Sequence, residues 1–134
     1  MIYASYFSNL RRIPLNITPI SISLFSPKWY SGLEYKKLAP TIEIFRRWKD
    51  GYRIISPDRR QNEYIAAYNK QVLSKLSIDE VIFDISEIAK FSNPKWYEIS
   101  DVVLLCYEST GFCHRHIVSE WLMSNDICVQ EYPR

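Results

Sequence analysis

Two apolar runs on either side of an amphipathic segment constrain the fold of this chain most strongly. Residues 101–107 read DVVLLCY, a short continuous apolar stretch that is typical of a strand buried on both faces. Residues 113–125 follow after a short loop and predict a helix, and residues 126–132 predict a strand. The buried side of that helix is expected to hold Ile117, Val118, Trp121 and Leu122. This order predicts a right-handed βαβ unit with parallel strands.

The rest of the chain predicts further strands and helices. Two more strands are expected, at 2–7 and 19–25. Three more helices are expected, at 41–49, at 61–76 and directly after Ser77. Thr41 is a candidate cap for the first of these helices, and residues 50–60 form a polar, basic connection. We therefore predict an α/β domain, three-layer-like, with a small, largely parallel or mixed sheet flanked by helices.

Length and composition limit the classes of protein to which the chain can belong. At 134 residues it predicts one domain over residues 1–134 with a single hydrophobic core. No apolar run approaches the roughly 20 residues of a membrane span, and the first residues lack the pattern of a secretory signal. We expect a cytoplasmic protein with no membrane contact and reduced thiols, in which Cys128 is buried. Neither a cofactor nor an oligomeric state follows from the sequence.

Charge is unevenly distributed along the chain. Residues 1–60 carry 11 Lys and Arg against 4 Asp and Glu, whereas residues 61–134 carry 6 against 11. The basic half favours a phosphate-bearing small molecule or a nucleic acid as partner. The alternative is a set of solvated loops and helix faces that the acidic half balances.

The segment LLCYESTGFCHRH, at residues 104–116, carries the candidate chemistry. Its loop contains Gly111, which permits close backbone approach, and it leads into the N-terminus of a helix. The free N–H groups there and the guanidinium of Arg115 would receive a phosphate or a carboxylate. Arg115 is therefore the expected anion ligand.

The cysteines and histidines of this segment allow two other interpretations. Cys106, Cys113 and His114 are metal-ligand types, but the C-x6-C spacing is not a usual zinc motif, and Cys113 and His114 should point apart on a helix. We therefore expect no metal ion. Cys113, near the helix N-terminus and Arg115, is a candidate catalytic thiol, and Cys106 is expected to be either a ligand-binding residue or part of the core. His114 should lean inward and act in catalysis, whereas His116 should face outward.

Glu108 is the other candidate for catalysis. It comes just past the predicted strand end, where a carboxylate can bind ribose hydroxyls, or attack or stabilise an anomeric carbon. The alternatives are a solvent-facing loop glutamate and an ion-pair partner for Arg115.

A long loop after the second predicted strand, PKWYSGLEYKK at 27–37, is expected to share this rim. Its aromatic residues could stack on a base and its lysines could meet phosphates: Trp29, Tyr30, Tyr35, Lys36 and Lys37. Tyr6, with Ser5 and Asn9, lies near the end of the first strand and could complete the rim. The alternative is a packed aromatic loop with solvated lysines. PKWY recurs at 94–97 in a different context, which indicates coincidence rather than duplication.

Several segments together resemble the domain-of-unknown-function family 488, a prokaryotic and phage family. The matching pieces are YASYF (3–7), PISIS (19–23), PKWYSGLEYKKLAP (27–40), YNKQVLSKL (68–76) and VVLLCYESTGFCHRHIVSEWL (102–122). The resemblance implies a compact α/β domain with a site around Cys106, Glu108, Cys113, His114 and Arg115. It also implies nucleotide or nucleic-acid base chemistry, without naming a reaction.

Three functions fit these observations. The first is an enzyme that binds and processes a nucleotide or a nucleic-acid component at an anion pocket on the strand-to-helix turn. The second is a non-catalytic bacterial or phage protein that sequesters a nucleotide or blocks a partner with the same pocket. The third is a nucleic-acid-binding module that uses the basic first half.

Overall fold

The structure is a computed structural model that describes residues 1–92 and 101–133. Its centre is one sheet of five strands, and every described pairing in it is parallel. The order across the sheet is β3-β2-β4-β1-β5. The strands are β1 (Ile2–Tyr6), β2 (Ile17–Ser21), β3 (Leu33–Glu34), β4 (Asp101–Cys106) and β5 (Val129–Glu131). The predicted α/β class and the parallel sheet are confirmed.

The register of the central strands brings the candidate segments to one edge. β1 pairs with β4 so that Tyr6 lies opposite Cys106, and β2 pairs with β4 so that Ser21 lies opposite Leu105. All three strands therefore end at the same edge of the sheet, where open α/β sheets bind their ligands.

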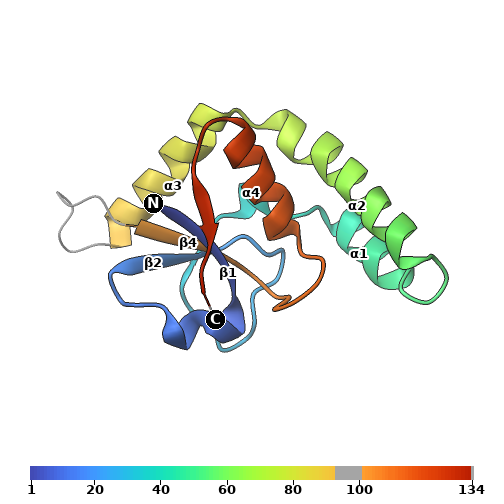
Figure 1. Cartoon of the computed structure of the whole chain (residues 1–134), viewed down its shortest axis with the longest axis horizontal. Helices are drawn as coiled ribbons and strands as arrows, with labels where there is room; N and C mark the ends of the chain where they lie inside the picture. The colour runs from blue at the N-terminus through green and yellow to red at the C-terminus, as the bar shows by residue number, and fades with distance from the viewer. Residues whose placement is uncertain (93–100, 134) are drawn as a thin grey trace.

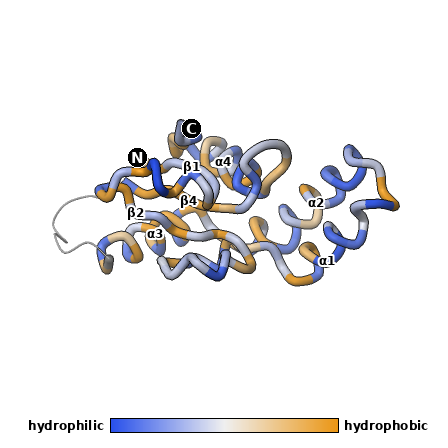
Figure 2. Tube along the Cα trace, turned by 90° about the horizontal axis from the view of Figure 1, so that it is seen from below, coloured by the Kyte–Doolittle hydropathy of each residue, from blue (hydrophilic) through white to orange (hydrophobic). Residues whose placement is uncertain are grey.

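Four α-helices and three short 3-10 helices connect the described strands. The α-helices are α1 (Ile42–Asp50), α2 (Pro57–Gln71), α3 (Ile78–Ser92) and α4 (His114–Ser124). The 3-10 helices are η1 (Phe7–Arg12), η2 (Lys36–Leu38) and η3 (Leu73–Lys75). α1 and α2 pack against each other as a hairpin that extends away from the sheet (Figures 1 and 2). No helix of the described residues is long and apolar enough to cross a membrane.

Capping residues fix where the helices begin. The Thr41 hydroxyl accepts a hydrogen bond from the Ile44 N–H at 3.2 Å, and the Ser77 hydroxyl accepts one from the Glu80 N–H at 3.1 Å. Thr41 was the predicted cap of α1, and a helix was predicted to begin directly after Ser77. Ser56 caps α2 and Pro57 occupies its first turn, so this helix begins inside the segment predicted as a connection at 50–60.

The two faces of the sheet are covered differently. Ala4, Ile20 and Leu104 face a core cluster to which all four α-helices contribute, including Val81 of α3 and Val118 of α4. The opposite face has a smaller cluster, with side chains from the strands, from η1 and from the loops that follow η1 and β2. The members of that smaller cluster are Phe7, Ile13, Ile17, Val103 and Leu105. The sheet therefore lies between an α-helical layer and a thinner layer of 3-10 helix and loop.

Two details of the sequence prediction are wrong. β2 runs from Ile17 to Ser21 rather than over 19–25, and Pro19 lies within it. That position is tolerated because β3 pairs only with Ile20 and Ser21, which leaves the first half of β2 at the sheet edge. Cys128 is exposed rather than buried, because it precedes β5 instead of lying within it. Most of the loop predicted at 91–100 lies outside the described residues, as does the second PKWY motif.

Candidate functional site

The candidate site forms where β4 passes into α4. β4 ends at Cys106, and α4 begins at His114 with Cys113 as its N-cap residue in an extended conformation, at φ −149° and ψ 144°. Gly111 turns the connecting loop with a φ of +75°, a conformation that costs glycine little and other residues more. The backbone thus brings the end of the strand and the start of the helix together around a short loop.

Cys106 and Cys113 are joined in a disulfide in this structure. The expectation of reduced thiols is therefore wrong for the state described here. The chain has three cysteines, an odd number, and for that reason no pair of them was expected to form a disulfide. Both side chains are buried, at 1% and 6% exposure. In the disulfide state Cys113 has no thiolate, so its predicted role as a nucleophile requires prior reduction.

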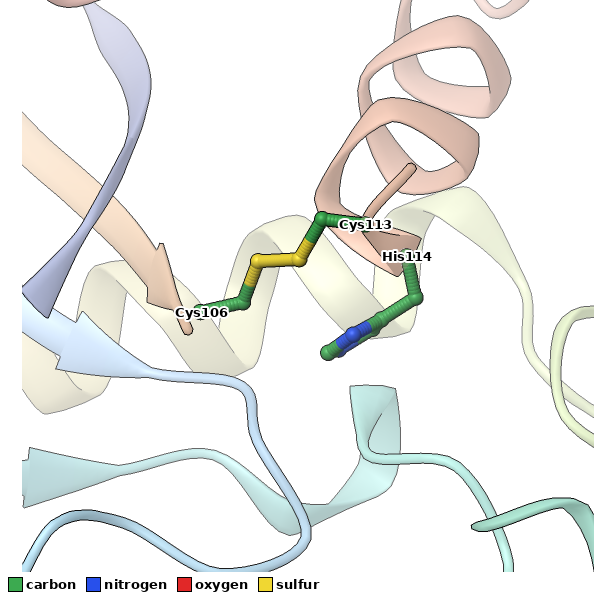
Figure 3. A group of neighbouring side chains, drawn as sticks. All are labelled: Cys106, Cys113 and His114. Carbon is green, nitrogen blue, oxygen red and sulfur yellow. A yellow bond between two sulfur atoms is a disulfide. The ribbon is translucent and has the colours of Figure 1, made fainter. Parts of the chain in front are cut away.

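His114 lies beside the disulfide (Figure 3). One of its ring nitrogens and the sulfur atoms of Cys106 and Cys113 all lie within 4.8 Å of one another, so the three could hold a metal ion. The prediction that Cys113 and His114 point apart is wrong. Helical spacing does not apply to this pair, because Cys113 is the extended N-cap and only His114 is in the helix.

Burial sets the protonation state of His114. Its Nε2 lies 2.8 Å from the Ile22 carbonyl oxygen, which is an acceptor, so Nε2 carries the proton and Nδ1 carries the lone pair. Desolvation and, to a smaller extent, the Arg115 charge together lower the pKa of His114 to about 4, against the opposing effect of that hydrogen bond. His114 is therefore a neutral imidazole with a free lone pair near neutral pH, which suits a base or a metal ligand.

Arg115 is buried, with 2% of the residue exposed, and it contacts groups of the protein. Its Nε donates a hydrogen bond to Glu131 Oε1 at 2.9 Å, and its Nη2 lies 2.8 Å from the same oxygen. Nη1 donates to the Glu108 carbonyl oxygen and to Cys106 Sγ, the latter at 3.3 Å. The ring of Tyr6 lies 5.7 Å from the guanidinium carbon. Arg115 thus ties β4, the loop, α4 and β5 together, an arrangement that favours a positioning role over direct contact with an anion.

Glu108 lies at the junction of two adjoining cavities. The first, the inner cavity, has a volume of about 100 Å³ and is lined by Glu108, Cys106, Cys113 and His114 together with aromatic and apolar side chains. The second has a volume of about 760 Å³, within the range of small-molecule sites, and it also includes Glu108. The residues predicted to be catalytic, Glu108, Cys113 and His114, therefore line one cavity, and their catalytic role stays a prediction.

The second cavity, here called the aromatic cleft, is formed by residues that sequence reasoning missed. Its aromatic lining consists of Phe25, Phe45, Trp48, Tyr52, Tyr107 and Phe112. Lys49 and Arg60 add positive charge to it: the Lys49 ammonium lies 5.2 Å from the Phe45 ring centre, and the Arg60 guanidinium lies 3.5 Å from that of Trp48. Desolvation lowers the pKa of Arg60, whereas Tyr52 and the Glu108 carboxylate raise it.

The structure does not bring the predicted rim of residues 27–37 to this cleft. Trp29 and Tyr30 pack edge-to-face against Phe7, on the side of the sheet opposite the α-helices. The Tyr30 hydroxyl donates to the Leu33 carbonyl at 2.6 Å, and burial raises the pKa of Tyr30 to about 12. Ser5 and Asn9 are also buried, with the Asn9 side-chain amide donating to the Ser5 hydroxyl at 3.0 Å.

The remaining members of that rim have partners within the fold. The Tyr35 hydroxyl donates to Asp84 of α3 at 2.6 Å, and Lys37 pairs with the same carboxylate at 3.0 Å. Lys36 donates to the carbonyls of Ser23 and Leu24, two residues that line the inner cavity. These side chains fix the loop against α3 and β2. His116 is exposed, as its helical position predicted.

A five-stranded parallel sheet with a polar cluster at the carboxyl ends of its central strands defines an α/β domain with an edge-of-sheet site. Residues 18–126 match the model of the DUF488-N3a family, which is described as the active DUF488-N3 subclade. Because the match covers well over half of the chain, the chain belongs to this family, which confirms the resemblance seen in the sequence. No curated protein and no solved structure matches the chain.

Proposed function

We propose that this protein binds a nucleotide, or a nucleotide unit of a nucleic acid, in the aromatic cleft and processes it at Glu108. The observation that carries the proposal is the combination of side chains in one cavity. Six aromatic rings, two cationic side chains and one carboxylate line it. A base, a phosphate and a sugar each have a matching chemical group in this set.

The exposed rings of the cleft suit a stacked base. Phe25 is 55% exposed, Tyr107 is 49% exposed and Tyr52 is 70% exposed, so part of each residue is open to a ligand. Aromatic side chains bind bases of any sequence by stacking, at about 1–3 kcal/mol per base. Phe45 and Trp48 hold the floor of the cleft through contacts with Phe25 and Phe112.

Positive charge beside the rings suits the phosphate. Residues 42–60, which include α1 and the start of α2, carry six Lys and Arg against three Asp and Glu. Lys49 is exposed within this group, and Arg47 and Arg59 share the carboxylate of Glu63. Lys49 and Arg60 are the cations that line the cleft itself, so they are the proposed phosphate contacts.

Glu108 is the proposed catalytic residue. Glu108 lines both the aromatic cleft and the inner cavity, so it would lie beside the sugar of a nucleotide stacked in the cleft. A carboxylate there can hold ribose hydroxyls or act on the anomeric carbon. The hydrogen bond from Arg115 to the Glu108 carbonyl holds the backbone of this residue in place.

Binding is tested by equilibrium titration with nucleoside monophosphates and with a short single-stranded oligonucleotide. Phe25→Ala should weaken affinity about tenfold, as expected for one stacking contact. Phe83→Ala is the matched control, because Phe83 is a 64% exposed phenylalanine on α3, away from the cleft. Lys49→Ala should also weaken affinity, whereas Lys75→Ala in η3 should not. Equal effects of Phe25→Ala and Phe83→Ala would exclude the cleft as the binding site.

Processing is tested by chromatography of the nucleotide after incubation with the protein. Glu108→Gln should keep the affinity and abolish product formation. Ligand recovered unchanged from the wild-type protein would favour the alternative of a non-catalytic sequestering protein. Affinity for the oligonucleotide alone, falling steeply with salt, would instead favour a nucleic-acid-binding module.

A further inference from the structure

Three buried side chains with soft or borderline ligand atoms meet in the lining of the inner cavity. They are Cys106 at the end of β4, Cys113 at the N-cap of α4 and His114 in its first turn (Figure 3). We propose that, when the two cysteines are reduced, these three residues bind a divalent ion of the zinc class and leave one coordination position open. This site is independent of the nucleotide proposed above, since it concerns the metal alone.

The three ligand atoms are close enough to share one tetrahedral ion once the disulfide between two of them is opened. Zn–S bonds of about 2.3 Å and Zn–N bonds of about 2.0 Å place such ligands roughly 3.5–3.8 Å from one another. The ligand atoms here lie within 4.8 Å of one another. The Cα atoms of Cys106 and Cys113 are 7.1 Å apart. That separation exceeds the range of about 4.4–6.8 Å usual for disulfides, so the two thiols of the reduced protein can separate around an ion without movement of the backbone.

Each ligand has a neighbour that favours its metal-binding form. The Ile22 carbonyl accepts from Nε2 of His114 at 2.8 Å, which orients the ring and leaves Nδ1 for the ion. Arg115 Nη1 lies 3.3 Å from Cys106 Sγ and would stabilise a thiolate there. Cys113 lies at the start of α4, where the helix dipole also favours a thiolate.

Charge balance agrees with a buried divalent ion. Two thiolates and a neutral imidazole give a net charge of zero with a divalent cation, so the occupied site adds no uncompensated charge to the interior. The nearby Arg115 is already balanced by Glu131. Mixed sulfur and nitrogen ligands select zinc-class ions over magnesium or calcium, which prefer oxygen.

The inner cavity supplies the open position. Three protein ligands and one exchangeable position are the arrangement of catalytic zinc sites, whereas structural sites use four protein ligands. Glu108 lines the same cavity, so a carboxylate lies next to the place where a metal-bound water would sit. Binding to zinc at that position would lower the pKa of the water to about 7.

The disulfide seen in the structure is the metal-free form of this site. A water-soluble phosphine breaks the S–S bond and is oxidised to the phosphine oxide with the oxygen of one water molecule. The two hydrogens of that water go to the two sulfur atoms as thiols. Binding of the ion then displaces both thiol protons to solvent.

The test is a titration of the phosphine-reduced, full-length protein with Co²⁺, a coloured substitute for Zn²⁺. Reduced wild-type protein should bind one equivalent and develop a thiolate-to-cobalt absorption band together with visible bands of a tetrahedral ion. Zn²⁺ should then displace Co²⁺ and abolish both signals. Protein left in the disulfide form should give neither signal.

Variants separate the proposed site from adventitious binding. Cys106→Ser and Cys113→Ser should each weaken Co²⁺ binding at least a hundredfold and reduce the charge-transfer band, and His114→Asn should alter the visible bands. Cys128→Ser, which removes the exposed cysteine, is the matched control and should bind as wild type does. Circular dichroism of each variant checks the fold. A reduced, folded wild-type protein that gives no cobalt band overturns the inference, as does a band that disappears only in Cys128→Ser.

Discussion

The guanidinium of Arg115 in α4 and the carboxylate of Glu131 in β5 form a two-nitrogen contact at 2.9 and 2.8 Å. Arg115 is 2% exposed in its side chain, whereas Glu131 is 45% exposed. The same guanidinium reaches Cys106 and the Glu108 carbonyl, so this pair joins the strand end and the site loop to the last strand of the sheet.

This geometry predicts a structural cost for losing Arg115. Arg115→Ala should lower the free energy of unfolding by about 3 kcal/mol. The substitution removes the hydrogen-bond donor of the Glu131 carboxylate and of the Glu108 carbonyl. Glu131→Gln should cost about 1 kcal/mol, since its carboxylate is half exposed to water. Urea unfolding measures both changes. If Arg115→Ala keeps its stability but loses nucleotide affinity, Arg115 is a direct anion ligand, as the sequence predicted.

The depressed pKa of His114 predicts a pH-dependent stability. The unfolded chain protonates this histidine below a pH of about 6.5, whereas burial lowers the pKa in the folded protein to about 4. The contribution is therefore complete above pH 6.5 and is lost as the pH falls toward 4, by up to about 3 kcal/mol. Urea unfolding measures the free energy of unfolding at pH 7 and at pH 5. The decrease from pH 7 to pH 5 should be about 2 kcal/mol larger for the oxidised wild type than for His114→Gln. The same pH dependence in both proteins contradicts this assignment.

The conformation of Gly111 predicts that substitution there lowers stability through the backbone and not through a steric clash. Its φ is +75°, and a Cβ atom added there meets nothing within 4 Å. Gly111→Ala should therefore destabilise the protein by about 1 kcal/mol through backbone conformation alone. Gly111→Asn should cost less, because asparagine adopts this conformation more readily. Thermal unfolding of the two variants makes the comparison, and a larger cost for asparagine would point to a clash instead.

Tyr35 distinguishes the rim predicted from the sequence from the cleft seen in the structure. Its hydroxyl donates to Asp84 at 2.6 Å, and the phenol is 5% exposed. Tyr35→Phe should lower stability by about 1 kcal/mol and leave nucleotide affinity unchanged. Paired urea unfolding and ligand titration check this. A loss of affinity without a loss of stability would return Tyr35 to the binding site.

Local sequence signals predicted the elements that hold the site. The apolar run ending at Cys106 predicted β4, and the spacing of Val118 and Leu122 predicted the buried side of α4. Thr41 and Ser77 marked the beginnings of α1 and α3. These predictions succeeded because periodicity and capping depend on residues a few positions apart. They also placed Cys106, Glu108, Cys113 and His114 in one neighbourhood.

The cleft itself could not be predicted in this way. Phe25 and Phe45 come from separate segments, and their ring centres lie 5.5 Å apart. The ring centres of Phe112 and Trp48, which are far apart in the sequence, lie 4.8 Å apart. Helical spacing puts Phe45 and Trp48 on the apolar side of α1, a pattern that is shared by core residues and by the lining of a cleft. The meeting of Cys113 with His114 depends on a single extended residue before the helix, which sequence periodicity does not encode.

Photo-crosslinking tests the central claim, that a nucleotide base stacks in the aromatic cleft, most directly. A short single-stranded oligonucleotide that carries 5-iodouracil is bound to the protein, and the complex is irradiated. Mass spectrometry then identifies the crosslinked peptide and residue. Crosslinks at Phe25, Tyr107 or Phe112 that unlabelled nucleotide suppresses are the predicted result. Crosslinks at Trp29 or Tyr30, on the opposite face of the sheet, would contradict it, as would labelling that competitor does not reduce.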